Sequence, residues 1–259
     1  MRTGSPLRPG AVQRLARIGM VLEAAYHTPE GELGNKPDPL DEAVYIILSF
    51  QTDLARFSSV WTRLRAAYPT WEELEHARAG DVARILRVGG LHRQKARTIR
   101  RLLAAVRKVA GELSLDLIRT MNNDDAERLL TRLPGLSWKA ARCVLLYSLG
   151  RDVLPIDSNS FRILKRTGVL ARRAVYRRRT LHDAIQAAVP ADRRRALHVN
   201  LVVHGQRTCT PRDPRCARCP LLADCPKVGI AFRTSSDVRV LRATLVEARD
   251  MVARGEDRP

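Results

Sequence analysis

The stretch LPGLSWKAARC, residues 133–143, joins two apolar, helix-like segments through a Pro-Gly turn. Apolar residues recur at intervals of three and four on both sides, which predicts a helix, a tight corner and a second helix. The start of a helix leaves backbone N–H groups available for an anion, so Gly135 and Ser137 are predicted to contact a DNA phosphate. An ordinary helical corner is the alternative for this motif taken alone.

Lys139 lies in the first turn of the second predicted helix, in a chain that otherwise relies on arginine. Of the 46 basic residues, 40 are arginine and only six are lysine. An amine, unlike a guanidinium, can lose its proton and attack a carbon atom. Lys139 is therefore a candidate nucleophile, and chance placement is the alternative.

Helical periodicity extends along the chain in both directions from this corner. The connections are marked by Pro, Gly, Asn and Asp, and no convincing alternating strand pattern is found. The fold class is therefore predicted to be all-α. Helices are predicted at 11–26, 40–50, 52–67, 71–77, 81–88, 93–110, 115–120, 124–132, 138–149, 158–168, 175–188, 192–206 and 237–253.

The chain is strongly basic, with a net charge of +19 and a pI of about 10.9. Such a bias favours a polyanionic partner, usually nucleic acid, although solvated surface charge is the simpler explanation. Aromatic residues make up only 5%, which argues against a platform that stacks many single-stranded bases. The short apolar runs predict no transmembrane helix, and the polar N-terminus predicts no secretory signal, so a cytoplasmic location is expected.

Four of the five cysteines lie within residues 209–225. Cys209, Cys216, Cys219 and Cys225 have the spacing C-x6-C-x2-C-x5-C. One compact loop of four thiolates suits a [4Fe–4S] cluster, which takes one thiolate per iron. Zinc is the alternative, but structural zinc sites usually pair two separated C-x-x-C knuckles. The fifth cysteine, Cys143, lies in an apolar helical stretch and is expected to be a core residue.

Asp157 precedes a predicted helix, so its default role is that of an N-cap. The chain must also return from the end of helix 138–149 within the segment GRDVLP. That return can bring Asp157 beside Lys139 at the positive end of the helix. There a carboxylate can accept a proton and stabilise a developing cation.

The sequence resembles the endonuclease III branch of the helix-hairpin-helix (HhH-GPD) DNA glycosylase superfamily. The resemblance rests on LPGLSWKAA, then IDSNSFRILKR, then HGQRTC leading into the four-cysteine spacing, and it covers roughly residues 40–227. It implies that Lys139 attacks the sugar C1′, expels the base and forms a Schiff base, and that Asp157 is the catalytic carboxylate. It also implies that Gln51 and Leu91 wedge into the duplex, and that the cysteines hold a [4Fe–4S] cluster.

The resemblance further implies two α-helical lobes with double-stranded DNA in the cleft between them, and we expect a monomer. The expected organisation is a disordered segment 1–9, an N-terminal helix and loop at 10–39 that packs on the cluster lobe, a helical barrel with the hairpin at 40–156, a lobe with the cluster loop at 157–228, and a C-terminal extension at 229–259.

Three features distinguish the sequence from the patterns of related glycosylases. Ser137 replaces the second glycine of the hairpin, so its phosphate contacts are expected to differ in detail. The Ser-Asn-Ser that follows Asp157 is more similar to the plant 5-methylcytosine glycosylases than to endonuclease III. Ile46 stands where adenine glycosylases have a glutamate, and those enzymes also lack the hairpin lysine, so an adenine-excising role is disfavoured.

These features predict a base excision repair glycosylase with AP lyase activity, acting on a damaged or modified pyrimidine in duplex DNA. Two alternatives stay within DNA binding: a monofunctional glycosylase, and a non-catalytic iron–sulfur protein that uses hairpin and cluster for recognition only. The third alternative is a redox or iron–sulfur carrier. The absence of GxGxxG, P-loop and HExxH motifs argues against that class.

Overall fold

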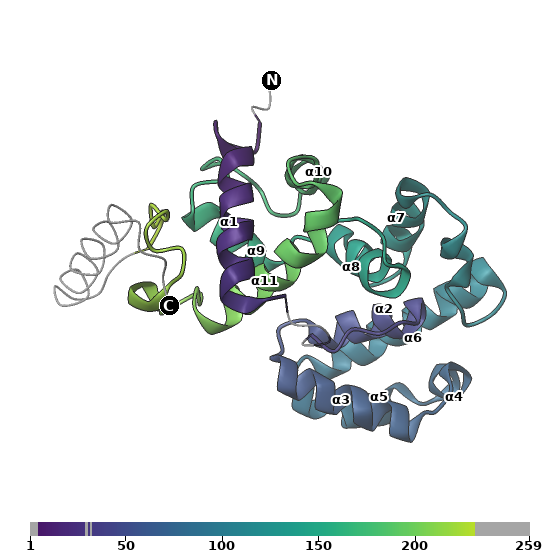
Figure 1. The fold of residues 1–259 in the computed structure, drawn as a ribbon. Coiled ribbons are helices and arrows are strands. Elements are labelled where there is room, and N and C mark those ends of the chain that lie inside the picture. Colours follow the sequence, from purple (N-terminus) through teal and green to yellow (C-terminus); the bar gives the residue numbers. More distant parts are fainter. Residues whose placement is uncertain (1–4, 29–30, 32, 231–259) are drawn as a thin grey trace. The chain divides into compact units, whose positions relative to one another are not determined.

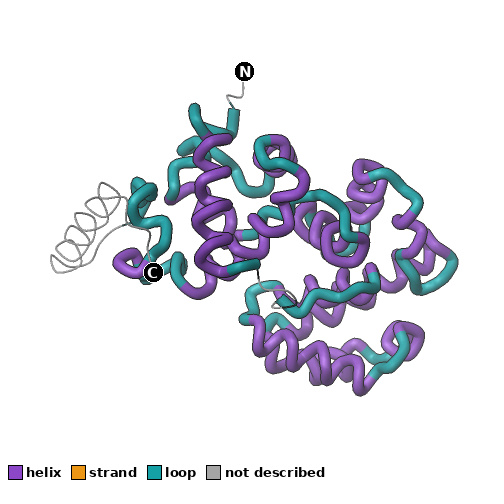
Figure 2. The backbone as a smooth tube through the Cα atoms, in the orientation of Figure 1, coloured by secondary structure: helices purple, strands orange, loops and turns teal. Residues whose placement is uncertain are grey.

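The computed structural model describes residues 5–28, 31 and 33–230, and the predicted helix at 237–253 lies outside this range (Figure 1). Figure 2 shows helices and connecting loops throughout these residues. The described part of the chain contains no strand beyond an isolated antiparallel bridge between Leu7 and Leu170. The predicted all-α fold class is confirmed.

The α-helices follow one another along the chain with short 3-10 turns (η) between some of them. They are α1 (Ala11–Tyr26), α2 (Pro39–Ser49), α3 (Leu54–Ala67), α4 (Trp71–His76), α5 (Ala79–Ile85), η1 (Leu86–Gly89), α6 (His92–Ala110), η2 (Asp116–Arg119), α7 (Asn123–Arg132), α8 (Trp138–Leu149), α9 (Ser158–Arg166), α10 (Arg179–Ala187), η3 (Ala191–Arg193), α11 (Arg194–Arg207) and η4 (Cys216–Arg218).

Side-chain caps explain where many of these helices begin. Short polar side chains accept a hydrogen bond from a first-turn N–H group that the helix itself leaves unpaired. Thr70 and Glu73 form a complete capping box at α4. The other helices that begin with a side-chain cap are α2, α3, α7, α8 and α9, capped by Asp38, Asp53, Asn122, Ser137 and Asp157.

The described residues divide into two compact units. The hairpin unit contains residue 31 and residues 33–155, and the cysteine unit contains residues 5–28 and 156–230. We predicted instead that the loop up to residue 39 packs with the cluster lobe, whereas residues 33–39 belong to the hairpin unit. The reason lies in this loop itself, because Asn35 and the Lys36 N–H bind the carboxylate of Glu42 in α2.

The hairpin unit is built around α2, whose residues from Leu40 to Leu48 are buried apart from Asp41. A helix that is apolar on nearly all sides belongs at the centre of a core. α2 packs against α8, α3 and α6, while α7 packs against α8 to form the predicted hairpin. The hairpin helix α8 therefore packs directly against α2, one of the most buried helices of the unit.

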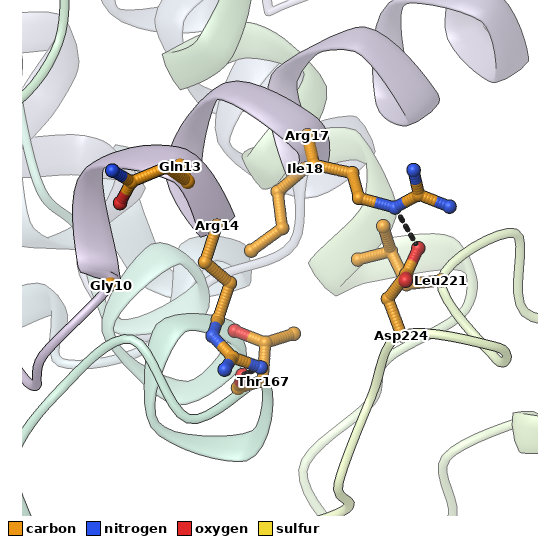
Figure 3. A pocket seen from close by; sticks show the side chains of 8 residues that line it. All are labelled: Gly10, Gln13, Arg14, Arg17, Ile18, Thr167, Leu221 and Asp224. Carbon is orange, nitrogen blue, oxygen red and sulfur yellow. Dashed lines mark hydrogen bonds and ion pairs between the residues drawn. The ribbon is translucent and has the colours of Figure 1, made fainter.

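The cysteine unit combines the N-terminal helix with the segments after residue 155. α11 is buried from Leu197 to Gly205 and packs against both α1 and α9. A pocket of about 280 Å³ lies at the edge of this packing. Arg14 and Arg17 of α1 are among the residues that line it (Figure 3). There Arg17 Nε donates to Asp224 Oδ2 over 2.6 Å, so α1 is tied directly to the cysteine loop.

Two predictions near the N-terminus and at α10 need correction. Residues 1–9 were expected to be disordered; residues 1–4 lie outside the described range, but in residues 5–9 the Pro6 carbonyl accepts from the Ala171 N–H and the Arg8 N–H donates to the Val169 carbonyl. The helix predicted at 175–188 begins only at Arg179. The preceding arginine-rich residues form turns, and Val175, which contributed to the apolar spacing, is exposed and is not buried as a helix face would require.

Smaller differences concern helix ends. The helix predicted from residue 52 begins at Leu54, because the side chain of Asp53 caps it. The segment predicted as a helix at 115–120 is the 3-10 turn η2, and the segment 81–88 is shared between α5 and η1. The predicted central positions of these elements are correct.

Candidate functional site

The hairpin turn depends on a glycine at position 135. Gly135 has a φ of 85°, in the region that side chains rarely adopt, and a Cβ there would lie 2.4 Å from Thr98 Cγ2. The turn is closed by the Leu136 N–H, which donates to the Leu133 carbonyl. Any larger residue would therefore push the hairpin away from α6.

Ser137 and Lys139 occupy the start of α8. Ser137 is exposed and caps the helix, because its hydroxyl accepts from the Ala140 N–H over 3.4 Å. The serine that replaces the expected glycine thus satisfies one of the first-turn N–H groups of α8. Lys139 is the second residue of the helix and is partly exposed. The positive end of the helix dipole disfavours the ammonium form of a lysine placed there.

A buried ion pair holds the two hairpin helices together. Arg142 Nε of α8 lies 3.1 Å from Glu127 Oε1 of α7, and both residues are almost completely buried. Removal of one partner would leave the other charge buried and uncompensated. The pair therefore links α8, which carries Lys139, to α7.

Glu42 of α2 is a buried carboxyl within electrostatic range of Lys139. Burial raises the pKa of Glu42 to about 7, against smaller lowering effects from its hydrogen bonds with the Lys36 N–H and with Asn35 and from the charge of Lys139. Glu42 Oε2 accepts from the Lys36 N–H over 2.7 Å. A titratable group that sequence analysis did not identify thus lies near the candidate nucleophile.

Gln51 and Leu91 lie at the tips of two loops in the hairpin unit. Gln51 follows α2 and has a φ of 53°, while Leu91 precedes α6 and has a φ of 48°. Both are exposed, and Leu91 retains 43% of its surface as one of the exposed large apolar residues. A leucine with a positive φ is uncommon, because this conformation is unfavourable for a bulky side chain.

In the cysteine unit, Asp157 has both carboxylate oxygens engaged. Oδ1 accepts from the Ser160 N–H over 2.7 Å and so caps α9, while Oδ2 accepts from Asn159 Nδ2 over 2.8 Å. The predicted N-cap role of Asp157 is confirmed. Hydrogen bonds to the charged form favour an ionised carboxylate.

Asn159 is in turn held by Arg162. Arg162 Nη2 donates to Asn159 Oδ1 and to the Gly205 carbonyl, each over 2.9 Å, and Arg162 Nε donates to the Cys209 carbonyl over 2.9 Å. A Cβ at position 205 would lie 2.5 Å from the Cβ of Asn159, so Gly205 must be glycine. A continuous chain of hydrogen bonds therefore links Asp157 to the first cysteine of the loop.

The four cysteines of the loop are partly buried and close enough to influence one another. Burial raises the pKa of the Cys219 thiol to about 12, and the charges of the other loop cysteines add to this effect. Arg166 Nη1 lies 3.2 Å from Cys209 Sγ and donates to the Thr210 carbonyl over 2.7 Å. The Arg166 guanidinium therefore lies directly beside the first thiol of the loop.

His204 lies beside this loop as a neutral imidazole. Burial, followed by the charge of Arg162, lowers the pKa of His204 to about 4. Its Nδ1 is 2.8 Å from the Tyr26 hydroxyl, and its Nε2 is 3.7 Å from Cys219 Sγ. The imidazole thus ties α1 and α11 to the cysteine loop.

The cysteine loop supplies donors of the kind that a metal cluster takes. Within the described residues, no group of three or more His, Cys, Asp or Glu converges on one point as a single ion requires. A [4Fe–4S] cluster takes one thiolate at each corner, so its ligands need not converge. The four neighbouring thiols of the loop are a donor set that a [4Fe–4S] cluster accepts, with one thiolate for each iron.

The predicted site residues fall into two groups. Gly135, Ser137 and Lys139 share the hairpin unit with Gln51 and Leu91. Asp157 shares the cysteine unit with the four loop cysteines, so its expected pairing with Lys139 stays a prediction. The supporting residues were not predicted from the sequence; they are Glu42, Asn159, Arg162, Arg166 and His204. The sequence offered a signal for two of them: Arg162 and Arg166 are four residues apart, so they lie on the same face of α9.

The comparison with protein families decides the affiliation. A family described as HhH-GPD superfamily base excision DNA repair protein matches residues 44–186, more than half of the chain. The chain belongs to the HhH-GPD superfamily. This superfamily of base excision DNA repair proteins is the one that the hairpin sequence predicted.

Individual relatives are similar over most of the chain. Endonuclease III from Thermotoga maritima is 28% identical over 191 residues, which cover 73% of this chain and 83% of that protein. A candidate DNA glycosylase from Arabidopsis thaliana is 26% identical, and the match covers 73% of this chain and 65% of that protein. Protein ROS1A from rice is 26% identical, but the match spans only 9% of its length. These similarities support an endonuclease III-like branch of the HhH-GPD superfamily. The chain spans less than two thirds of the length of some of these relatives.

Solved structures share the fold. A non-covalent endonuclease III–DNA complex has a TM-score of 0.70 and 23% identity, and the match covers 83% of this chain and 95% of that chain. A thermostable thymine-DNA glycosylase has a TM-score of 0.70 at 18% identity, with coverage of 84% and 98%. In the described part of this HhH-GPD chain, no helix has the length and apolar character needed to span a membrane.

Proposed function

We propose that this chain is a bifunctional DNA glycosylase and AP lyase that removes a damaged or modified pyrimidine from double-stranded DNA. The observation that carries the proposal is the position of Lys139. It is the second residue of α8, directly after a glycine turn, in a member of a base excision repair superfamily. The DNA named in the descriptions of the similar endonuclease III structures supports the same partner.

The proposed reaction begins with the neutral amine of Lys139. Its Nζ lone pair attacks the sugar C1′, the C1′–N bond breaks, and the base leaves with the bonding electrons and takes up a proton. Opening of the sugar ring at the C1′–O4′ bond then gives an imine between Nζ and C1′. Loss of a C2′ proton expels the 3′ phosphate by β-elimination, and water hydrolyses the imine to regenerate the amine.

Asp157 is proposed as the carboxylate of this reaction. Its hydrogen bonds from Asn159 and from the Ser160 N–H favour the ionised form. An ionised carboxylate can accept the proton that Lys139 must lose and can stabilise positive charge on the sugar as the base departs.

Gln51 and Leu91 are proposed to enter the duplex at the extruded nucleotide. Extrusion of a base costs a few kcal/mol, least when the base is damaged or mispaired. An apolar side chain that fills the vacated space replaces part of the lost stacking. The exposure of Leu91 at a loop tip fits this role.

The four cysteines are proposed to hold a [4Fe–4S] cluster with a structural role. When bound, the cluster would supply a rigid anchor for the loop, and no step of the reaction passes through it. Arg212, Arg215 and Arg218 are exposed on this loop. A loop fixed by its four cysteines would present these cations to DNA phosphates.

A panel of duplexes that carry single modified pyrimidines tests the proposed activity. Release of the free base and nicking of the strand are measured separately for the wild-type protein and for Lys139→Arg and Asp157→Asn. A bifunctional enzyme releases a base and nicks the strand, and Lys139→Arg should lose nicking. Base release without nicking by the wild-type protein would indicate a monofunctional glycosylase. Binding without either product would indicate a non-catalytic DNA-binding protein.

A further inference from the structure

Lys95 is another lysine where this chain would by default use arginine. It lies in the first turn of α6, and only 3% of its surface is exposed. A buried ammonium is costly unless its hydrogen atoms are all bonded. Its burial therefore calls for an explanation that neither the hairpin nor the cysteine loop supplies.

The ammonium of Lys95 has three oxygen partners. Nζ donates to the Leu48 carbonyl over 2.8 Å, to Thr52 Oγ1 over 2.7 Å and to the Gly89 carbonyl over 2.8 Å. The Thr52 hydroxyl in turn donates to the Gly89 carbonyl over 2.5 Å. The three donors of the amine are therefore all used, and each partner is an uncharged oxygen. Burial lowers the pKa of Lys95 to about 8, which still leaves the amine mainly protonated at pH 7.

These partners are close in the sequence to the two exposed loop tips, Gln51 and Leu91. Leu48 and Thr52 bracket Gln51 in the chain, and Gly89 lies two residues before Leu91. The backbone of Lys95 completes the arrangement, because its N–H donates to the Leu91 carbonyl over 2.9 Å. One residue thus binds the segment that carries Gln51 and the segment that carries Leu91.

Both tips adopt a backbone conformation that side chains other than glycine rarely take. The φ angles of Gln51 and Leu91 are 53° and 48°. This left-handed conformation is unfavourable for a residue other than glycine, because the Cβ atom comes too close to the following carbonyl oxygen. Such conformations persist only where the surrounding structure imposes them. The hydrogen bonds of Lys95 are placed to impose both.

We propose that Lys95 is the positioning residue that fixes the Gln51 and Leu91 tips as one rigid pair, so that both side chains enter a duplex together. The inference rests on the proposed function, in which these two residues contact the site of an extruded base. A lysine suits the task because three donors on one tetrahedral nitrogen can reach three oxygens of different loops. The flat fork of a guanidinium cannot match this geometry.

The test measures binding to a duplex that contains one stable tetrahydrofuran abasic analogue opposite 2-aminopurine, and to the same duplex without the analogue. Lys95→Met keeps the length of the side chain but removes the charge and the donors. It should lower the preference for the abasic duplex by about tenfold, equivalent to about 1.4 kcal/mol, and reduce the 2-aminopurine fluorescence change. Affinity for undamaged duplex should stay unchanged, because phosphate contacts supply it. The matched control is Lys108→Met on the exposed side of the same helix.

A second measurement separates positioning from general stability. In a Gln51→Ala, Leu91→Ala background, Lys95→Met should cause no further loss of preference, because it acts through those two tips. An equal loss in that background, or a wild-type preference in the single variant, would overturn the inference. If Lys95→Met does not fold, Thr52→Val removes one anchor and should give a smaller loss in a folded protein. A wild-type protein without preference for the abasic duplex would instead overturn the proposed function itself.

Discussion

Asn159 Nδ2 donates to Asp157 Oδ2 over 2.8 Å, and the same asparagine accepts from Arg162 over 2.9 Å. The candidate catalytic carboxylate is therefore not held by its helix alone. It is oriented by a side chain that Arg162 connects to the carbonyl of Cys209. The Ser-Asn-Ser sequence after Asp157 departs from endonuclease III, and its asparagine is the residue that holds the carboxylate.

Asn159→Ala should slow base removal without unfolding the protein. Loss of the amide leaves Asp157 able to rotate, and a misplacement of about 1 Å can lower a catalytic rate by up to about a hundredfold. Single-turnover base release measures the effect, with Ser158→Ala on the exposed side of α9 as the control. Equal rates for the two variants would show that the amide does not orient the carboxylate.

The cysteine loop should bind iron rather than zinc. The purified protein should be brown and contain about four irons and four sulfides per chain, as Cys₄ ligation of a cubane cluster requires. Replacement of Cys216 by serine should lower the iron content, whereas Cys143→Ser, in the core of the hairpin unit, should leave it unchanged. One tightly bound zinc per chain, with no iron, would contradict the cluster.

Glu42 should make the stability of the hairpin unit depend on pH. Its pKa is raised from 4.5 to about 7, so between these pH values the folded chain holds a proton that the unfolded chain has lost. The contribution of Glu42 is therefore fully present below pH 4.5 and is lost as the pH rises through about 7. Glu42→Gln should cancel this loss, which is worth up to about 3 kcal/mol.

Urea unfolding of wild type and Glu42→Gln at several pH values measures this effect. The stability of the variant relative to wild type should increase between about pH 4.5 and about pH 7, because in this range unfolding of the wild type releases the Glu42 proton. Glu112→Gln, at an exposed position, is the control and should show no such trend. A difference that is constant with pH would exclude the elevated pKa.

Binding to undamaged duplex should depend steeply on salt. The log–log slope of affinity against salt concentration should be about −0.9 for each phosphate neutralised. Replacement of Arg212, Arg215 and Arg218 by alanine should make the slope shallower by about one for each phosphate that these arginines neutralise. An affinity that is independent of salt would mean that the charge of +19 serves another purpose.

Much of the helical architecture was predictable because it follows from local patterns. The hairpin turn needs Gly135 for its backbone conformation, and α2 has the apolar character of a central helix. The start of α10 was not predictable, because the apolar spacing around Val175 continues a helical pattern through a loop. Domain boundaries were misplaced because hydrogen bonds from residues 35 and 36 to Glu42 leave no local signal.

The site was predictable only where chemistry imposes a residue type at a fixed spacing. The four cysteines and Lys139 meet this condition, and their spacing carried the family resemblance. Lys95 and Arg162 do not, because their partners come from segments far away in the sequence. A lysine in an arginine-rich chain was a usable signal in both α6 and α8, and sequence analysis applied it only to Lys139.

The most direct test of the proposed function is covalent trapping on an abasic-site duplex with borohydride, which reduces an imine to a stable amine. The wild-type protein should form a cross-linked protein–DNA band. Lys139→Arg, which keeps the charge but cannot form the imine, should form none while retaining affinity for DNA. Lys108→Arg should trap like the wild type. A Lys139→Arg protein that traps at the wild-type level would show that another amine is the nucleophile and would contradict the role proposed for the hairpin lysine.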